Sequence, residues 1–381
     1  MELSWDGKQV VAGDAQTITA LVKGQYGEKR KEGIVLEPEE ALYLIDVRGA
    51  ECTDSRGKVL GFNELAGKFS GKKLLARYLT YKDWRDRGLF IKSESGEKGN
   101  KRKTSLQRYR REAIELKMEK TRGMFFLDDL VCTLDDQEAG EKLYREYWLG
   151  QMGTYKAAHR GSISKLDVFE TLLLMEKKKL ILENCNADEI KEVACRRIEY
   201  FEDLNNVYRE WRDAGYIVKT GFKFGTHFRI YLPGASPGKG REWTHSKHVL
   251  HVFPRKSSLL ISEWARAIRV AHSVKKTFIL AIPGRGKIER GHVDFALYHR
   301  KGQDVESPKT GNPSFLMLSL SEDEYLGGEE LAASIKTCSE RGLDLLVAIA
   351  DRESSVTYYL IKRIELPGSK YEYYEIEWMQ P

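Results

Sequence analysis

A tyrosine, a histidine and two lysines in the middle of the chain have side chains that could perform acid–base chemistry. Tyr231 lies near the end of the alternating run FRIYL, and His245 begins the run HSKHVLHVF after a turn rich in Gly, Pro and Ser. A hairpin brings the end of its first strand close to the start of its second. Lys275 and Lys276 follow at the end of the next helical stretch. The sequence therefore predicts that a phenol and an imidazole lie close together, with two ammonium groups a little further along the chain.

Each of these residues also has an explanation that involves no chemistry. Tyr231 alone is typical of an aromatic residue packed on a strand, and His245 alone is typical of a polar residue at the edge of a loop. Lysines at the C-terminal end of a helix interact favourably with the helix dipole, so Lys275 and Lys276 need no further role. Residue types alone leave both explanations open.

The spacing of three histidines suggests a metal site, which the strand geometry argues against. His245, His248 and His251 follow one another at intervals of three residues. On a strand, His245 and His251 share a face whereas His248 points the other way. No cluster of Asp and Glu offers a magnesium site either. We therefore expect neither a metal ion nor another cofactor.

Composition limits the class of protein. The chain has 381 residues and a net charge of +6, and 41% of its residues are hydrophobic. This length favours two or three domains with real cores. The five cysteines are scattered without a CxxC pair, so neither a disulfide framework nor a zinc knuckle is expected. No apolar run is long enough for a membrane helix, and the first residues lack a signal-peptide pattern, so we expect a cytoplasmic protein.

The chain repeats itself. Residues 77–93, RYLTYKDWRDRGLFIKS, match residues 204–220, LNNVYREWRDAGYIVKT, at a constant offset of 127 positions. Tyr and Trp three residues apart share one helix face, and the glycine that follows can end the helix. The apolar residues after the glycine predict a strand. Upstream, we align GQYG at 24–27 with GQMG at 150–153.

A second repeat lies later in the chain. Residues 265–282, ARAIRVAHSVKKTFILAI, match residues 332–349, AASIKTCSERGLDLLVAI, at an offset of 67. Each copy predicts a helix that runs into a buried strand. In this alignment Lys276 faces Leu343, and Arg269 faces Lys336.

We therefore expect an α+β protein built from repeated units. Each complete unit would have a helical N-terminal half with a small sheet and a C-terminal half with a mixed sheet. The family resemblance given below implies that the C-terminal half is nuclease-like and that one copy is catalytic and two are degenerate. The expected parts are a degenerate N-terminal-half unit (1–95), a basic linker or helix (96–123), the two halves of the catalytic unit (124–206 and 207–300), a second linker (301–313) and a degenerate structural C-terminal-half unit (314–381).

The motifs of the middle unit resemble those of the archaeal tRNA-splicing endonucleases. The similar stretches are VYREWRDAGYIVKTGFKFGTHFRIY, HSKHVLHV and ARAIRVAHSVKKTFILAI, preceded by YWLGQMG and LDVFETLLLMEKKKL. The resemblance covers the middle unit fully and the other units as degenerate copies. It implies a three-unit homodimeric enzyme that excises introns from precursor tRNA at bulge-helix-bulge junctions without a metal ion.

The resemblance also implies a catalytic trio and its mechanism. The family's Tyr, His and Lys fall on Tyr231, His245 and Lys276, with Lys275 as the alternative lysine and otherwise a contact for RNA. In the family the 2′-hydroxyl of the RNA attacks the adjacent phosphorus, which gives 2′,3′-cyclic phosphate and 5′-hydroxyl ends. Tyr231 would act as the base, His245 as the acid and Lys276 as the stabilising cation.

Further family residues are expected to bind RNA or the partner subunit. One of the two arginines that sandwich a bulged base matches Arg269, and the other would be Arg290 or Arg285. Because two cuts need two active sites and each chain has one active copy, a homodimer is expected. Asp351 and Glu353 match the acidic loop that in the family docks on the opposite catalytic unit.

Some readings of the sequence stay open. The basic run KGNKRKTSLQRYRR at 98–111 is either a solvated linker or a contact for phosphate. An RNA-binding structural subunit without activity is the alternative to an enzyme. A metal-dependent DNA nuclease would need paired carboxylates near a lysine, and none is visible.

We predict that a loop insertion broadens the range of substrates. From Gln25 to Glu40 the first copy has 15 steps, and from Gln151 to Glu170 the middle copy has 19; the four extra residues fall in MGTYKAAHRGSISK. Replacing Lys156, Arg160 and Lys165 together with alanine should reduce cleavage of some precursor RNAs more than others, as measured by comparing cleavage rates over a set of substrates. Unchanged cleavage of every substrate would discard the prediction.

Overall fold

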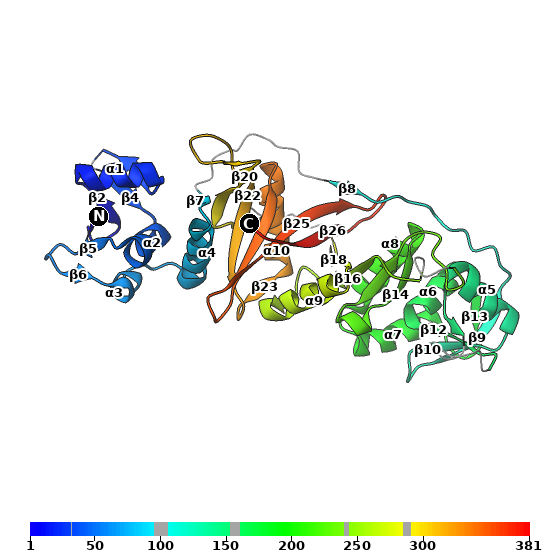
Figure 1. The fold of residues 1–381 in the computed structure, drawn as a ribbon. Helices are drawn as coiled ribbons and strands as arrows, with labels where there is room; N and C mark the ends of the chain where they lie inside the picture. Colours follow the sequence, from blue (N-terminus) through cyan, green and yellow to red (C-terminus); the bar gives the residue numbers. More distant parts are fainter. Residues whose placement is uncertain (32, 95–105, 153–160, 240–243, 285–290) are drawn as a thin grey trace.

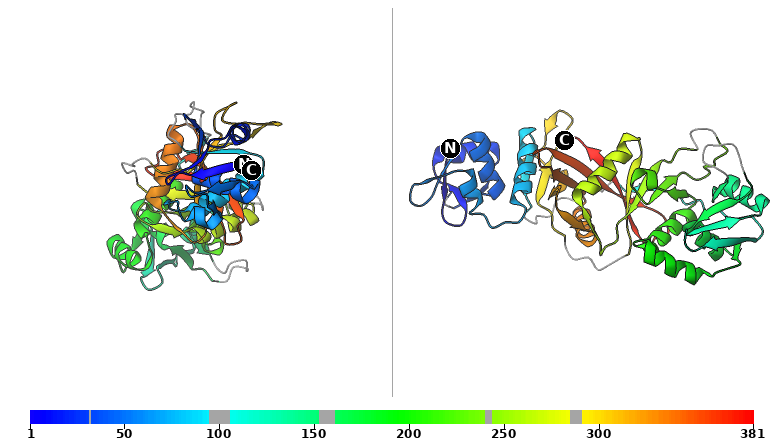
Figure 2. Two further views of the ribbon diagram at one scale, coloured as in Figure 1. Left: turned by 90° about the vertical axis from the view of Figure 1, so that its left-hand side faces the viewer. Right: turned by 90° about the horizontal axis from the view of Figure 1, so that it is seen from below.

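The computed structural model describes residues 1–31, 33–94, 106–152, 161–239, 244–284 and 291–381 as a mixed α+β chain. The molecule is elongated, with three bodies in a row (Figures 1 and 2). Residues 1–66 form one end, a large sheet occupies the centre, and residues 121–200 form the other end. No helix among the described residues has the length and apolar character needed to cross a bilayer.

The N-terminal body is a six-stranded sheet with three helices. The sheet order is β3-β4-β2-β1-β5-β6. The elements are β1 (Glu2–Trp5), β2 (Val10–Ala12), α1 (Ala15–Gly24), β3 (Glu28–Arg30), β4 (Gly33–Leu36), α2 (Pro38–Arg48), β5 (Glu51–Thr53), β6 (Val59–Leu60) and α3 (Phe62–Ala66).

The body at the other end is built on a similar plan. Its five-stranded sheet has the order β11-β12-β10-β9-β13. The elements are β9 (Thr121–Phe126), β10 (Val131–Leu134), α5 (Gln137–Tyr147), β11 (Gln151–Met152), β12 (Ser164–Asp167), α6 (Val168–Glu176), β13 (Leu180–Leu182) and α7 (Ala187–Arg197).

Both bodies join the central sheet through the same set of polar contacts. In the first, Lys92 Nζ lies 2.9 Å from a carboxylate oxygen of Glu40, which also accepts a hydrogen bond from the amide of Gly27. In the second, Lys219 Nζ lies 2.6 Å from Glu170, which accepts from the amide of Gly150. The arrangement of lysine, glutamate and glycine amide is therefore the same at both ends of the molecule.

These contacts correct the alignment of the upstream glycines. The sequence comparison set Gly24 against Gly150, but the glycine that meets the glutamate is Gly27 in the first body. Gly27 and Gly150 also share a left-handed backbone, with φ of 65° and 75°. The shared dipeptide Gly-Gln had aligned Gly150 with Gly24, which lies three residues before the equivalent Gly27. The segment from the equivalent glycine to the glutamate is therefore 13 positions long in the first body and 20 in the second.

The central sheet contains eleven of the described strands. Ten of them follow the order β14-β15-β16-β18-β26-β25-β24-β22-β19-β7, and β8 pairs beside β25. The elements of the central body are α4 (Leu74–Asp86), β7 (Phe90–Ser93), β8 (Gln107–Arg108), α8 (Phe201–Asp213), β14 (Ile217–Thr220), η1 (Phe222–Phe224), β15 (Phe228–Tyr231), β16 (His248–Val252), β17 (Ser258–Leu260), α9 (Ile261–Ser273), β18 (Thr277–Ile282), β19 (Phe295–Tyr298), β20 (Arg300–Lys301), β21 (Asp304–Val305), β22 (Phe315–Ser321), β23 (Tyr325–Gly327), α10 (Gly328–Glu340), β24 (Asp344–Ala350), β25 (Val356–Glu365) and β26 (Glu372–Met379). Four of these strands lie outside the large sheet, since β17 pairs with β23 and β20 pairs with β21 in two small sheets.

The two ends of this sheet mirror each other. Strand β16 runs parallel to β18, and β22 runs parallel to β24 in the same way. At the midline, β26 and β25 pair antiparallel. Five strands from β14 to β26 therefore form one half, which we call the first half, and five from β25 to β7 form the second half.

Two strands join the half that their position in the chain would not suggest. Strand β26 lies within residues 314–381 but pairs with β18 in the first half, and β7 lies within residues 1–95 but pairs with β19 in the second half. The expected boundaries thus separate strands that are neighbours in the sheet, because an offset between repeats does not record which half a strand joins.

Helices α4 and α8 pack their aromatic face against the two halves. Trp84 and Trp211 are fully buried, as are Tyr81 and Tyr208 three positions earlier. After each helix a glycine with positive φ, Gly88 or Gly215, lets the chain reverse into a strand. The Tyr–Trp spacing in the sequence therefore marks the side of the helix that the sheet covers.

We predict that the midline of the sheet is essential for stability. Ile376 on β26 is fully buried and lies between Phe278 of β18 and Ile361 of β25. Ile376→Ala should lower the free energy of unfolding by about 2–5 kcal/mol, because it leaves a cavity. The matched truncation Leu75→Ala, at a side chain that is 62% exposed, should change it by less than about 0.5 kcal/mol. Urea denaturation measures both, and equal effects would contradict the prediction.

Candidate active site

The strand register brings three predicted residues to one edge of the sheet. Strand β15 is antiparallel to β16, so Tyr231 at the end of β15 lies beside the start of β16. His245 stands three residues before β16 begins. Strand β18 is parallel to β16, with Thr277 opposite His248, so Lys276 reaches the same edge. Antiparallel pairing followed by parallel pairing is therefore what gathers the three side chains.

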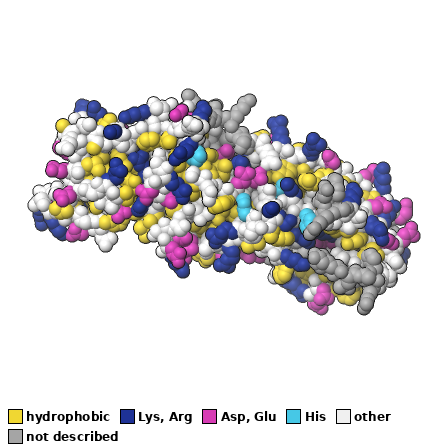
Figure 3. All heavy atoms as spheres, viewed as in Figure 1, with side chains coloured by type: hydrophobic (Ala, Val, Ile, Leu, Met, Phe, Trp, Pro, Cys, Tyr) yellow, Lys and Arg dark blue, Asp and Glu magenta, His cyan; other side chains and the backbone are white. Residues whose placement is uncertain are grey.

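All three residues line one open cleft of about 1260 Å³ between the first half of the sheet and the body of residues 121–200. Further cations line it, from both walls: Arg145, Lys165, Lys219, Lys223 and Arg229. The carboxylates of Asp167 and Glu170 line it as well. Most charges of the lining are positive, which suits a polyanionic ligand. On the face seen in Figure 3, by contrast, basic and acidic side chains are interspersed.

Tyr231 is held by aromatic and cationic neighbours. The residue is 4% exposed, and its ring centroid lies 4.6 Å from that of Trp148, at an interplanar angle of 49°. The guanidinium carbon of Arg229 lies 5.8 Å from the ring centroid. The cation over the ring is attracted by the electron-rich face of the aromatic system.

Lys276 is tied to the segment that carries His245. Its Nζ donates a hydrogen bond to the carbonyl oxygen of Ser246 at 2.6 Å and lies 5.4 Å from the ring centroid of Phe224. Burial, together with the positive charge of Arg229, lowers the pKa of Lys276 below its ordinary value. Lys275 is exposed, has φ of 54° and is not among the residues that line the cleft. Of the two lysines, the geometry brings Lys276 to Tyr231 and His245.

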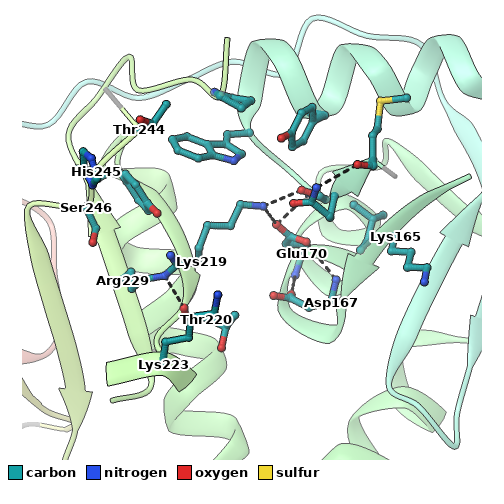
Figure 4. A pocket seen from close by; sticks show the side chains of 18 of the residues that line it. Lys165, Asp167, Glu170, Lys219, Thr220, Lys223, Arg229, Thr244, His245 and Ser246 are labelled. Carbon is teal, nitrogen blue, oxygen red and sulfur yellow. Dashed lines mark hydrogen bonds and ion pairs between the residues drawn. The ribbon is translucent and has the colours of Figure 1, made fainter. Parts of the chain in front are cut away.

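An ion pair joins the two walls of the cleft. Lys219 extends from β14 toward Glu170 of α6, and it also donates to the carbonyl oxygen of Gly150 at 3.0 Å (Figure 4). Asp167 lies nearby, and burial together with the charge of Glu170 raises its pKa to about 7. The sequence analysis identified Lys219 and Glu170 only as residues that match between the repeats. It did not single out Arg229, although this residue lies two positions before Tyr231 in the motif FRIY.

The other histidines lie apart from the trio. His245 lines the cleft and is exposed, whereas His248 is buried on β16. The ring of His251 packs against that of His227 at 4.4 Å, and His227 Nδ1 accepts a hydrogen bond from the amide of Val252 at 2.9 Å. Among the residues that the structure describes, no group of three His, Cys, Asp or Glu side chains is placed to hold a metal ion.

The remaining predicted residues are placed as follows. Arg269 is exposed on α9 and is not among the residues that line the cleft. Asp351 accepts hydrogen bonds from the amides of Glu353 and Ser355, so its carboxylate caps its own turn, and Glu353 is exposed. Lys165 lies on β12 and lines the cleft. Four predicted residues lie outside the described part of the chain: Lys156, Arg160, Arg285 and Arg290.

Comparison with known proteins identifies the class of domain. Residues 201–290 match the sequence model of the tRNA intron endonuclease catalytic C-terminal domain, and residues 1–66 match that of the tRNA intron endonuclease N-terminal domain. The first match contains the hairpin and Lys276.

Whole relatives lead to the family. The tRNA-splicing endonuclease of Methanococcoides burtonii is 26% identical over 323 residues, which are 68% of this chain and 89% of that protein. Those of Pyrobaculum islandicum and Hyperthermus butylicus are 32% and 36% identical over 166 and 159 residues, 41% and 39% of this chain and 87% and 83% of their own lengths. This chain belongs to the tRNA-splicing endonuclease family.

We predict a dependence of stability on pH that comes from buried histidines. Burial lowers the pKa values of His227, His248 and His251 to about 4, 3 and 3. Their contribution to the free energy of unfolding is fully present above an ordinary histidine pKa of about 6.5. It is lost as the pH falls toward 3, at about 1.4 kcal/mol per pH unit for each histidine, because the unfolded chain binds the proton first.

Two carboxylates act in the opposite direction and must be separated from this effect. Burial raises the pKa values of Glu39 and Asp167 to about 7, which stabilises the fold as the pH falls from 7. The measurement is therefore the difference between the wild type and His251→Leu in urea denaturation from pH 7.5 to 4.5. The difference should depend on pH, with a flatter loss of stability in acid for the variant. Parallel profiles would contradict it.

Proposed function

We propose that this protein excises introns from precursor tRNA at bulge-helix-bulge junctions, as a metal-independent RNA endonuclease. The observation that carries the proposal is that Tyr231, His245 and Lys276 line one cleft at the edge of three neighbouring strands. The names of the relatives, tRNA-splicing endonucleases, support the substrate class.

The three side chains suit cleavage by the RNA's own 2′-hydroxyl. Tyr231 removes the proton from this hydroxyl as it attacks the adjacent phosphorus. His245 protonates the departing 5′-oxygen, since an imidazole titrates near neutrality. Lys276 stabilises the charge that develops on the phosphorane. The products are a 2′,3′-cyclic phosphate and a 5′-hydroxyl.

We further propose a homodimer of the three-unit type. Two cuts at a fixed spacing require two active sites, and each chain has one cleft of this composition among its described residues. The turn of Asp351 and Glu353 between β24 and β25 would dock on the catalytic unit of the partner. Arg269, with Arg290 or Arg285, would stack on a bulged base.

The internal likeness supports one catalytic copy and two degenerate ones. The offset of 67 residues carries β16, α9 and β18 onto β22, α10 and β24. At the position of Lys276 the second half of the sheet has Leu343, which cannot supply a cation. The first and second halves thus descend from one unit, of which only the first retains the trio.

The competing function is an RNA-binding structural subunit without activity. It would use the same positive cleft and would not need the trio. A cleavage assay distinguishes the two, because only the enzyme converts precursor RNA in the presence of chelator.

We predict that His245→Ala lowers the rate of cleavage by about 10²–10⁴-fold, the usual contribution of a general acid, while leaving the affinity for RNA unchanged. Single-turnover assays with a bulged precursor tRNA in EDTA, and end-group analysis of the products, measure this. The exposed Lys256→Ala serves as control and should match the wild type. If the wild type binds the RNA and leaves it intact, the structural subunit is the correct function.

A further inference from the structure

The second part of the basic linker is hydrogen-bonded to both halves of the central sheet, at β25 in the second half and just before β14 in the first. We call residues 106–120 the strap; it runs from the centre of the molecule to the body of residues 121–200 (Figure 1). Strand β8 in the strap pairs with β25, and the amide of Tyr109 donates to the carbonyl oxygen of Glu365 at 3.0 Å. The amide of Glu112 donates to the carbonyl oxygen of Ala214 at 2.9 Å. A hydrogen-bonded strap differs from a freely solvated linker, so its side chains have defined positions.

A second cavity, which we call the strap pocket, lies between the strap and the edge of β15 and β16. Its volume is about 380 Å³. Arg108, Arg110 and Lys247 line it, together with one carboxylate, that of Glu112. Arg108 is already tied to Glu365 at 3.0 Å. No ion pair joins Arg110 or Lys247 to an acid among the described residues, so both cations are available to an anion.

Two residues that line the strap pocket each have a buried polar atom without a hydrogen-bond partner among the described residues. The atoms are Oη of Tyr109 and Nδ1 of His248, on side chains that are 8% and 5% exposed. The two rings lie 5.5 Å apart. Burial holds His248 neutral at ordinary pH, with its pKa lowered to about 3, so one ring nitrogen carries a hydrogen. A buried donor without a partner costs free energy, which an acceptor bound in the pocket would recover.

The second half of the sheet provides an internal comparison. At the offset of 67 residues, Phe315 stands for His248 and Ser314 for Lys247. The place of Tyr109, whose ring lies 5.5 Å from that of Trp211, is taken there by His299, 6.1 Å from Trp84. Lys247 and the buried His248 therefore occur in the first half of the sheet, which carries the trio, and the second half has neither residue at the equivalent positions.

One lining residue of the strap pocket, Lys247, is a strand neighbour of two members of the trio. Lys247 connects the relevant strands, because its amide donates to the carbonyl oxygen of Ile230 at 3.0 Å and its own carbonyl oxygen accepts from Thr277 at 3.3 Å. It is thus next to Tyr231 across one strand pair and next to Lys276 across the other. A group bound at Lys247 is held at a fixed place relative to the cleavage cleft.

We propose that the strap pocket binds a backbone phosphate of the substrate RNA, away from the scissile phosphate, through Arg110 and Lys247 with Tyr109 and His248 as buried donors. Arginine and lysine are the side chains that most often bind phosphate, and neutral donors complete the site. This inference rests on the proposed function for the identity of the ligand. Arg110 and Lys247 are then positioning residues, which fix the register of the RNA on the trio.

The first test is cleavage by the double variant Arg110→Ala/Lys247→Ala. The KM for a precursor tRNA should rise by about tenfold or more while kcat stays within about twofold, because uniform binding is lost. The slope of log affinity against log salt should fall by about 0.7–0.9 for each phosphate contact removed. Lys117→Ala, an exposed cation on the same strap outside the pocket, is the matched control and should behave as wild type.

The second test does not depend on cleavage and uses inorganic phosphate as the probe. Phosphate should raise the melting temperature of the wild type at constant ionic strength, and this rise should be absent in the double variant and smaller in Tyr109→Phe. His248→Phe, which copies the residue of the second half, should behave as Tyr109→Phe. If the wild type binds the RNA without cutting it, the double variant binds it more weakly and phosphate gives this pattern, the proposed function fails and the strap pocket stands as a site for RNA phosphate.

Three outcomes overturn the inference. The first is an unchanged KM and salt slope for the double variant. The second is a thermal shift with phosphate that is accompanied by no effect on RNA, which assigns the pocket to the free ion. The third is a change in the oligomeric mass of the double variant, measured by light scattering, with RNA affinity intact, which makes the strap a contact between subunits.

Discussion

The parallel register of β16 on β18 is the constraint on which the cleft depends. With Thr277 opposite His248, Lys276 falls at the same edge as His245 and Tyr231. A slip of one residue in a strand turns every side chain to the other face. The buried residues of both strands, Val249 and Leu250 on β16 and Phe278 and Ile279 on β18, resist such a slip because it would exchange the two cores that the sheet separates. Hydrophobic packing thus fixes the position of polar side chains that it does not touch.

The ion pairs of Lys219 with Glu170 and of Lys92 with Glu40 are equivalent contacts at the two ends of the central sheet, and one of them also lines the cleft. Both join a small sheet body to the central sheet, and both glutamates are buried. A buried ion pair brings little net stability, but breaking one leaves an uncompensated charge. The pairs therefore fix orientation between bodies. In the catalytic half the same pair also forms part of the cleft, so the orientation of the two walls and the shape of the cleft depend on one contact.

The sequence predicted the parts of the site that reside in local pattern. The alternation of FRIYL and HSKHVLHVF indicates a hairpin, and a hairpin brings Tyr231 near His245 whatever the rest of the fold. The Tyr–Trp spacing likewise indicated the buried face of α4 and α8. The preference for Lys276 over Lys275 came from the family motif; in the structure Lys276 contacts Ser246 whereas Lys275 is exposed.

Other features could not be obtained in this way because they depend on contacts between distant segments. The equivalence of Gly27 with Gly150 rests on which amide meets a glutamate, and a shared dipeptide was misleading. The pairing of β7 with β19 and of β26 with β18 joins segments about 200 and 100 residues apart, for which a repeat offset holds no information. The strap pocket needs Tyr109 placed against His248, which no local pattern encodes.

The exchange of β7 and β26 has a consequence for synthesis on the ribosome. Helix α4 and β7 are made early, yet β19, with which β7 pairs, emerges only after some 200 further residues, at rates of about 5–20 residues per second. During that interval Trp84 and Tyr81, both fully buried in the finished protein, have no sheet to cover them. The nascent chain therefore exposes the aromatic face of α4 for tens of seconds, and this face would be a binding site for holding chaperones.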